Sequence, residues 1–491
     1  MAARPCVPHL TLLALTLAGC ATTHRASTDA DRLAYGAYLR GLMLERESQL
    51  PEALDAYRLA LEHDHRSARL HVRVGAAFLK MGQADKALQA FHKALELAPD
   101  QPEALRWVAM LRTSQGELDQ GVAAYERLLE QEPEDAFLLS TLADLYVLQN
   151  KLPQAIDLYH RLIQLGGPSS QLHFNLGVLH GRLDQFDEAL CELSRAFELS
   201  PELLETRVAL GLTYEMAGRF DQAAAHYEEA VRQEPLNGRL YQHAARAHLN
   251  ARHFHEAAAN YQAVLDLAPR DLEAIMGLVR VWLAQYQFDE AAAFLARKLT
   301  ELGEPAELYV ALGIVYREAK HHEEAMRAFE RAVAKQADYA QGHFYLAAQL
   351  DQLGRRPEAR AALEHTIALD PNHPDALNYL GYLDAEAGVN LAEAKTMIER
   401  ALSLDPENGA YLDSLGWVYY KMDRLDEALA YLERAAALIH DDPVIFDHLG
   451  DVHFKRRNLD EARRFWQRAL ELDETQTAIQ EKLEQLLSSQ E

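Results

Sequence analysis

One stretch near the carboxyl end of this chain gathers residue types from which ligand pockets are made. In SLGWVYYKMDRLDEALAYLERA, residues 414–435, Gly416, Trp417, Tyr419 and Tyr420 stand almost side by side. Aromatic rings give a ligand apolar contact area, and a glycine lets another backbone or a ligand approach closely. The same cluster could also follow from a packing rule that recurs in a repeated sequence, so the rest of the chain must decide between the two.

No residues elsewhere have the spacing of a catalytic or metal centre. The sequence has no GxxxxGK phosphate loop, no GxGxxG and no GxSxG. KHHEEA, residues 320–325, joins two histidines to two acids, but adjacent helical residues point in different directions and make a poor metal cage. His255 and Glu256 lack the second histidine of a zinc-protease helix. We therefore expect no enzyme activity, no metal and no cofactor.

Charge and cysteine content narrow the possible partners. The formal net charge of −26 would repel a phosphate backbone, so we expect no nucleic-acid partner. The three cysteines, Cys6, Cys20 and Cys191, form no disulfide framework and no CxxC motif. We expect Cys191 to be a small buried residue of a helix.

The first twenty residues, MAARPCVPHLTLLALTLAGC, have the order of a secretory signal. Their apolar run, residues 10–17, is too short to span a bilayer as a helix. The ending Leu-Ala-Gly-Cys resembles a bacterial lipobox, which implies that residues 1–19 are a lipoprotein signal peptide and that Cys20 carries the lipid. A generic signal peptide with a chance cysteine is the alternative. By resemblance to enterobacterial sorting, Ala21 after the cysteine favours the outer membrane, facing the periplasm. Residues 20–32 would form the lipidated N-terminus and a flexible tether.

An alanine recurs through the rest of the chain at intervals of 34 residues, with one interval of 35 at the insertion in EAGVN. Its thirteen positions, one of them glycine, are Ala53, Ala87, Gly121, Ala155, Ala189, Ala223, Ala257, Ala291, Ala325, Ala359, Ala394, Ala428 and Ala462. Glycine or alanine fills a second series of positions, which includes Gly41, Gly75, Gly177, Gly313, Gly416 and Gly450, with Val279 as its larger member. A third series is mostly proline and a fourth mostly aromatic.

This period predicts a pair of short amphipathic helices in each unit. Small residues in both helices let the two backbones approach closely, and the aromatic residue of the second helix fills the space beside them. The proline ends the second helix, because it lacks an N–H and disfavours helix in the residue before it. Aspartate or proline two residues before the repeated alanine suits the start of that helix.

The pattern resembles the tetratricopeptide repeat (TPR), and LGLTYEMAGRFDQAAAHYEEAVRQEP, residues 210–235, matches nearly every position. The resemblance covers residues 33–474. It implies an all-α fold, a right-handed α-solenoid of about thirteen helix pairs in which neighbouring units share one core. Residues 475–491, which include leucines at 483, 486 and 487, are expected to form a capping helix and tail.

In the TPR family the first helix of each unit lines a concave groove. Applied here, the family pattern assigns Gly416 and Tyr419 to packing, whereas Trp417, Tyr420 and Lys421 face the groove. The predicted partner-binding patch consists of Asn378, Tyr382, Asp413, Trp417, Tyr420, Lys421, Asp447, Asp451, Phe454 and Lys455. A second candidate, which could hold a carboxylate, consists of Gln242, Arg246 and Arg280. The alternative is that groove aromatics pack against the next helix or face water.

The run from Asn378 to Ala435 resembles a family of long proteobacterial TPR lipoproteins. One role in that family is to act as adaptor for a periplasmic carboxyl-terminal processing protease, with a solenoid that binds protease and substrates. The resemblance implies a non-catalytic scaffold in the cell envelope that binds proteins or peptides through its groove and the membrane through its lipid. Three alternatives stay open: a pilotin-like or export-scaffold lipoprotein for pilus secretin or exopolysaccharide assembly, an enzyme without a recognisable motif, and a cytoplasmic scaffold with a misassigned start.

Overall fold

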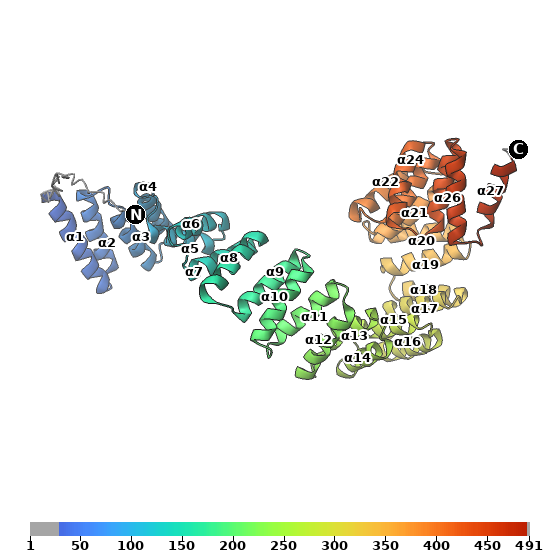
Figure 1. The fold of residues 1–491 in the computed structure, drawn as a ribbon, viewed down its shortest axis with the longest axis horizontal. Coiled ribbons are helices and arrows are strands. Elements are labelled where there is room, and N and C mark those ends of the chain that lie inside the picture. The colour runs from blue at the N-terminus through green and yellow to red at the C-terminus, as the bar shows by residue number, and fades with distance from the viewer. Residues whose placement is uncertain (1–28, 489–491) are drawn as a thin grey trace, which may run out of the picture. The chain divides into compact units, whose positions relative to one another are not determined.

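The computed structural model describes residues 29–488, and every regular element in that range is a helix (Figure 1). The twenty-seven helices form thirteen consecutive pairs and one final helix, which confirms the predicted all-α solenoid. The predicted signal peptide, Cys20 and most of the tether lie outside the described residues. None of the described helices is long and apolar enough to cross a membrane.

The chain divides into two compact units, residues 1–217 and residues 218–491. In the first unit each odd-numbered helix from α1 to α9 packs on the next helix, and α11 packs on α10. Its helices are α1 (Asp29–Arg46), α2 (Leu50–His63), α3 (Ala68–Lys80), α4 (Ala84–Leu97), α5 (Pro102–Ser114), α6 (Leu118–Gln131), α7 (Ala136–Leu148), α8 (Leu152–Gly166), α9 (Ser170–Arg182), α10 (Phe186–Leu199) and α11 (Leu204–Met216).

In the second unit each odd-numbered helix from α13 to α25 likewise packs on the next helix. At the ends of this unit, α12 packs on α13 and α27 packs on α26. Its helices are α12 (Phe220–Gln233), α13 (Gly238–Asn250), α14 (Phe254–Leu267), α15 (Leu272–Ala284), α16 (Phe288–Leu302), α17 (Ala306–Glu318), α18 (His322–Lys335), α19 (Ala340–Gln352), α20 (Arg356–Leu369), α21 (Pro374–Ala387), α22 (Leu391–Leu404), α23 (Gly409–Lys421), α24 (Leu425–Leu438), α25 (Pro443–Lys455), α26 (Leu459–Leu472) and α27 (Thr477–Ser488).

The repeated small residues pack as the sequence predicts. All twelve repeated alanines are completely buried. A Cβ added at Gly75 would lie within 3 Å of the ring of Phe91, sixteen residues further on, and Gly313 stands in the same relation to Phe329. Glycine in the first helix therefore makes room for the ring of the second helix.

One unit accommodates the aromatic ring of its second helix in a different place. Alanine replaces glycine at Ala245, and the ring of the corresponding Tyr261 lies against Gly277 in the first helix of the next unit. A Cβ at Gly277 would lie within 3 Å of that ring. The glycine that receives the ring has therefore moved to the neighbouring repeat.

The turn between the two helices of each pair contains one residue with positive φ. The residue types at this position reveal it in only some of the repeats. Five of these turn positions hold glycine. Three hold asparagine or aspartate, which tolerate positive φ, and the others hold residues for which it is uncommon, among them Tyr286 at 60° and Lys320 at 62°. The positions are Ser48, Gly82, Gly116, Asn150, Asp184, Gly218, Arg252, Tyr286, Lys320, Gly354, Gly388, Asp423 and Arg457.

Helix ends agree with the predicted signals apart from two local differences. The second helices end two residues before the repeated prolines, as α12 does before Pro235. The first helix begins at Asp29, inside the predicted tether, because Asp29 and Asp31 in its first turn favour a helix N-terminus. The inserted residue extends α21 to 14 residues, where 13 is usual among the neighbouring first helices.

The expectation for Cys191 is wrong, because its side chain is exposed. In α10 the residues facing the core are Ala189, Leu190, Leu193 and Ala196. Cys191 lies on the opposite side of the helix and leaves its thiol in solvent.

Candidate partner-binding site

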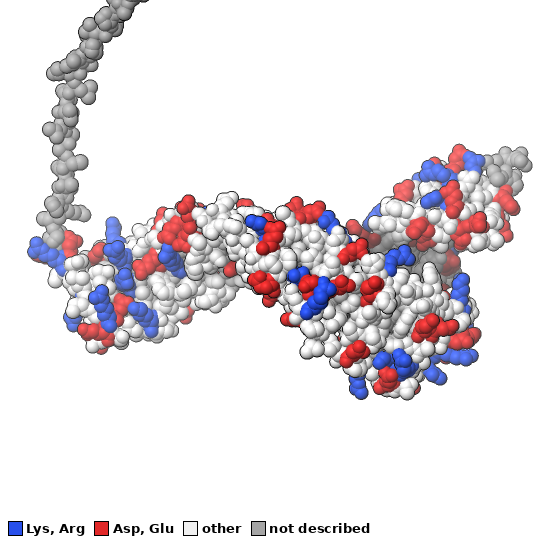
Figure 2. Space-filling model, turned by 60° about the horizontal axis from the view of Figure 1, so that its bottom comes forward, with Lys and Arg blue, Asp and Glu red and all other residues white. Residues whose placement is uncertain are grey.

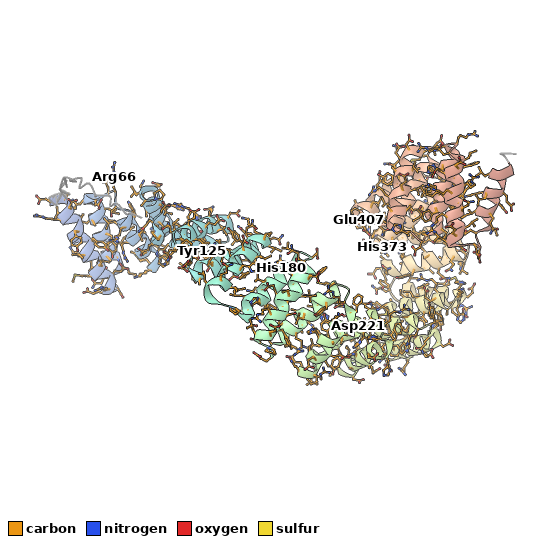
Figure 3. The ribbon with its side chains drawn as sticks, in the orientation of Figure 1. Arg66, Tyr125, His180, Asp221, His373 and Glu407 are labelled. Atoms are coloured by element: carbon orange, nitrogen blue, oxygen red, sulfur yellow. The ribbon has the colours of Figure 1, made fainter. Side chains whose placement is uncertain are left out.

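Capping side chains set the start of the three helices that carry the predicted C-terminal patch. His373, which Figure 3 labels, caps α21 by accepting a hydrogen bond from the backbone N–H of Ala376. Its ring packs on Phe344 at a centroid distance of 5.0 Å. Asn408 caps α23 and Asp442 caps α25 through their side-chain oxygens. These caps satisfy N–H groups that a helix leaves free at its N-terminus.

A stack of rings forms the centre of the patch. The indole of Trp417 lies between the ring of Tyr420, at 4.7 Å, and the imidazole of His448, at 4.0 Å, with interplanar angles of 10° and 16°. The ammonium of Lys421 lies 4.7 Å from the Trp417 ring centroid, and that of Lys455 lies 4.8 Å from the Tyr420 ring centroid. Cations at this distance from a ring face are attracted by its quadrupole.

The ring stack is not equally accessible along its length. Trp417 is only 7% exposed, and its indole N–H donates to the carboxylate of Glu386. Tyr420 is half-buried, whereas Phe454 is 46% exposed and lies 5.5 Å from the ring of Trp466. Trp417 therefore holds the site together from inside, and Tyr420 and Phe454 offer the open aromatic surface.

One acid of the patch is paired inside the structure. The Oδ1 of Asp413 lies 2.9 Å from the Nδ1 of the buried His448. Burial by itself would lower the pKa of His448, but the facing Asp413, together with Asp447 and Asp451, raises it. The pair is therefore a buried contact between α23 and α25 and leaves little of Asp413 for a ligand.

Two further acids are paired with the final helix. The Nζ of Lys482 in α27 lies 2.7 Å from carboxylate oxygens of both Asp447 and Asp451. Burial raises the pKa of Asp451, and Asp447 raises it further against the opposing effect of Lys482. Burial alone would lower the pKa of Lys482, but the two carboxylates raise it. The acidic fringe expected from the sequence is thus largely neutralised by the chain itself.

Helix α21 supplies the remaining two residues. Burial raises the pKa of Tyr382, with Glu386 and Asp413 adding to the effect, so the phenol stays a protonated donor. The side-chain oxygen of Asn378 is buried and has no hydrogen-bond partner within the described chain. Tyr382 packs against the hydrophobic cluster that contains Trp417.

Three residues of this site are absent from the sequence prediction, namely Glu386, His448 and Lys482. The sequence does contain a signal for two of them, because Lys482 follows His448 by one repeat length and each bonds an acid 35 residues earlier. The groove rule assigns no role to that position. Only the neighbouring helix shows that it faces the acid.

The second predicted site, Gln242 with Arg246 and Arg280, is given separate partners by the structure. The amide of Gln242 donates to Asp271 at 3.3 Å, Arg246 lies 3.2 Å from His243, and Arg280 donates to the carbonyl of Met276 in its own helix at 3.4 Å. Gln242 and Asp271 line a cavity of about 800 Å³ to which neither arginine contributes. Carboxylate binding by this trio stays a prediction.

On the face drawn in Figure 2, acidic and basic side chains lie interspersed along the surface. Between residues 29 and 488 no group of three or more His, Cys, Asp or Glu side chains is placed to hold a metal ion.

Models described as tetratricopeptide repeat match this chain over residues 68–101, 103–135, 140–203, 204–247, 243–304, 306–334, 349–389, 409–440 and 443–476. These segments together span most of the sequence, and no enzyme family is detected. The chain belongs to the tetratricopeptide repeat family, whose repeats imply a protein-binding scaffold.

A search of curated proteins finds no match to this sequence. Among solved structures, the chain is similar to the APC/C hetero-tetramer Cut9-Hcn1, with 15% identity over 94% of this chain and 96% of that chain and a TM-score of 0.45. It is also similar to yeast Tom70, with 16% identity over 94% of this chain and 97% of that chain and a TM-score of 0.40.

Proposed function

We propose that this protein is a lipid-anchored adaptor of the cell envelope, held at the periplasmic side of the outer membrane by Cys20. Its C-terminal repeats hold protein partners and deliver substrates to a periplasmic protease. The repeat family supports the scaffold part of this proposal. The observation that carries the choice of site is the open rim of Tyr420 and Phe454 beside the lysines at 421 and 455.

The charges of this rim favour a partner that presents a carboxylate. The acids behind the rings are already paired with His448 and Lys482. The ammonium of Lys421 lies 4.0 Å from the carboxylate of Glu386, which is a long distance for an ion pair, and Lys455 pairs with the exposed Asp423. Because such ion pairs contribute little free energy, either ammonium can exchange its partner at little cost. An extended peptide could place apolar side chains on the rings and a carboxylate on a lysine.

The experiment is a crosslinked pull-down from native membranes that compares the wild type with Tyr420→Ser/Phe454→Ser. The matched control is Phe137→Ser/Tyr286→Ser, which removes a tyrosine and a phenylalanine that are exposed elsewhere. Trp417 is left intact, because truncating a buried ring would unfold its surroundings.

A periplasmic protease or cell-wall hydrolase that is captured by the wild type and the control, but lost by the Tyr420/Phe454 variant, would support the adaptor and the site. Capture of secretin or polysaccharide-export components would favour the export-scaffold alternative. Equal capture by all three forms would reject the C-terminal rim as the binding site.

Membrane anchoring is tested separately with Cys20→Ser. Two or more acyl chains hold a protein firmly on a bilayer. The wild type should therefore sediment with membranes and the variant should be released. A variant that stays with the membranes in full would show that something other than lipid at Cys20 anchors the protein.

A further inference from the structure

Three consecutive first helices of the first unit, α7, α9 and α11, expose large apolar side chains at recurring positions. Val178 and Leu212 stand one residue after the small residue of their helices, and Leu148 and Met216 stand five residues after it. Leu148 is 70% exposed, Val178 39%, Leu212 38% and Met216 58%. Because consecutive repeats pack in the same way, equivalent positions lie side by side, and these four residues form an apolar strip.

The second unit has no such strip. At the same two positions of its first helices, all of which the structure describes, no residue is a large apolar side chain that is exposed. These positions hold mostly charged and amide side chains, among them Arg246, Asn250, Arg280, Glu318, Gln352, Glu386, Lys421, Asp451 and Lys455. The repeat pattern therefore does not require the apolar strip. Exposed apolar area that is confined to one part of a surface is typical of an interaction site.

A cavity of about 390 Å³ opens at the apolar strip between α7 and α9. Its apolar walls are Val147, Leu148, Phe174 and Val178, and Arg182 lines it as well. Pockets that bury a ligand have volumes of about 300–1,000 Å³. The cavity is therefore large enough to take an apolar side chain of a partner, with a guanidinium beside it.

One of the three charges along the strip lacks a charged partner. The hydroxyl of Tyr159 donates to Asp144 at 2.8 Å, and Glu215 has a partner elsewhere in the chain. Arg182 donates to the neutral amide oxygen of Asn150 at 2.9 Å and forms no ion pair with an acid of the described chain. A carboxylate of a partner would gain a charge-assisted hydrogen bond from Arg182.

The hydrogen bonds around the cavity favour a helical partner over an extended one. The amide oxygen of Asn175 accepts from Gln171 at 2.9 Å, and Asp144 accepts from Tyr159. Few groups therefore remain for the main chain of an extended peptide, and main-chain groups that are buried without partners are costly. A helix satisfies these groups internally and presents its apolar side chains along one face.

The length of the strip agrees with a short helix. Three first helices at axial separations of about 8–10 Å span about 16–20 Å, which corresponds to three to four turns at about 5.4 Å per turn. We infer that the apolar strip binds an amphipathic α-helix of a partner protein, with an apolar side chain in the cavity and an aspartate or glutamate against Arg182. This site is separate from the C-terminal rim and from the lipid anchor, so it does not depend on either proposal.

The test selects binders from a displayed library of peptides of about 16 residues with randomised apolar and charged positions. The target is the chain from residue 20 onward with Cys20→Ser. Peptides that bind Leu148→Ser/Val178→Ser are removed first, which leaves only those that need the strip. The matched control is Leu236→Ser/Val389→Ser, because Leu236 is 82% and Val389 46% exposed elsewhere on the chain.

We expect enriched peptides with apolar residues at helical spacing and one acid, which bind the wild type and the control alike. Arg182→Glu should weaken their binding by about tenfold, and exchanging the acid of the peptide for arginine should restore most of it. The inference would be overturned if no peptide is enriched. Enrichment of peptides with a central proline or strictly alternating apolar residues would also overturn it, because the ligand would then be extended.

Sedimentation velocity examines a second copy of the chain as the occupant. The wild type and Leu148→Ser/Val178→Ser should sediment alike as the protein concentration rises. Concentration-dependent association of the wild type and the control that is lost in Leu148→Ser/Val178→Ser would overturn the inference, because another copy of the chain would then cover the strip.

Discussion

Two glycines of α1 offer a direct test of the packing rule. A Cβ at Gly36 would have no atom within 4 Å, whereas a Cβ at Gly41 would lie within 3 Å of the ring of Tyr57. That ring is completely buried, and its hydroxyl donates to Glu45 at 2.5 Å. Gly36→Ala and Gly41→Ala therefore make the same chemical change on one helix in opposite surroundings.

The expected difference follows from two effects. Alanine is better than glycine in a helix by about 1 kcal/mol, and both variants gain this amount. Overpacking a core costs about 1–3 kcal/mol, and only Gly41→Ala pays it. The Ala245 repeat shows that a ring can lean aside, which places the cost toward the lower end. Gly36→Ala should thus stabilise α1 by up to about 1 kcal/mol, and Gly41→Ala should destabilise it by about 0–2 kcal/mol.

Hydrogen exchange of the amides in α1 and α2 is the appropriate measurement. In a repeat protein each unit contacts only its neighbours, so local opening reports a change that the melting of the whole chain would dilute. Protection should rise with Gly36→Ala and stay unchanged or fall with Gly41→Ala. Equal increases in both variants would refute the argument that the small residue makes room for the ring.

Three further results are expected. Trp417→Ala should destabilise the C-terminal repeats by about 3–5 kcal/mol in chemical denaturation and Phe454→Ala by less than about 1 kcal/mol, since only Trp417 is buried; equal losses would contradict this. Because Asp413 raises the pKa of His448 against the effect of burial, the pair stabilises fully below about pH 6.5 and its contribution disappears as pH rises through the folded-state pKa. The wild type should then lose more stability than His448→Gln between about pH 6 and about pH 9, and parallel pH profiles would argue against the pair. Finally, a maleimide should label the mature protein once, at the exposed Cys191; a second label would indicate a free thiol at Cys20.

Much of the fold could be predicted because the residues that pack the helices recur at the same positions in every repeat. The recurring alanine, the glycine partner of the ring and the proline after the second helix each act within one pair or its neighbour. The capping helix also followed, since its leucines lie one repeat length beyond the last core positions. The left-handed turn residue was not predicted, because its positions share no single residue type: five hold glycine, three hold asparagine or aspartate, which also tolerate positive φ, and the rest, such as Tyr286, give no signal of it.

For the candidate site, the sequence predicted which residues could line one patch but not which of them are accessible. The groove rule placed Trp417 and Tyr420 together, and they do stack. It could not show that His448 covers Trp417 or that Lys482 reaches Asp447 and Asp451, because those contacts join different helices. The sequence by itself determined which residues pack within a repeat, since packing repeats with the period of the chain. Only the tertiary structure decided which groove side chains remain open to a partner, since that depends on the unrepeated side chains of the next helix.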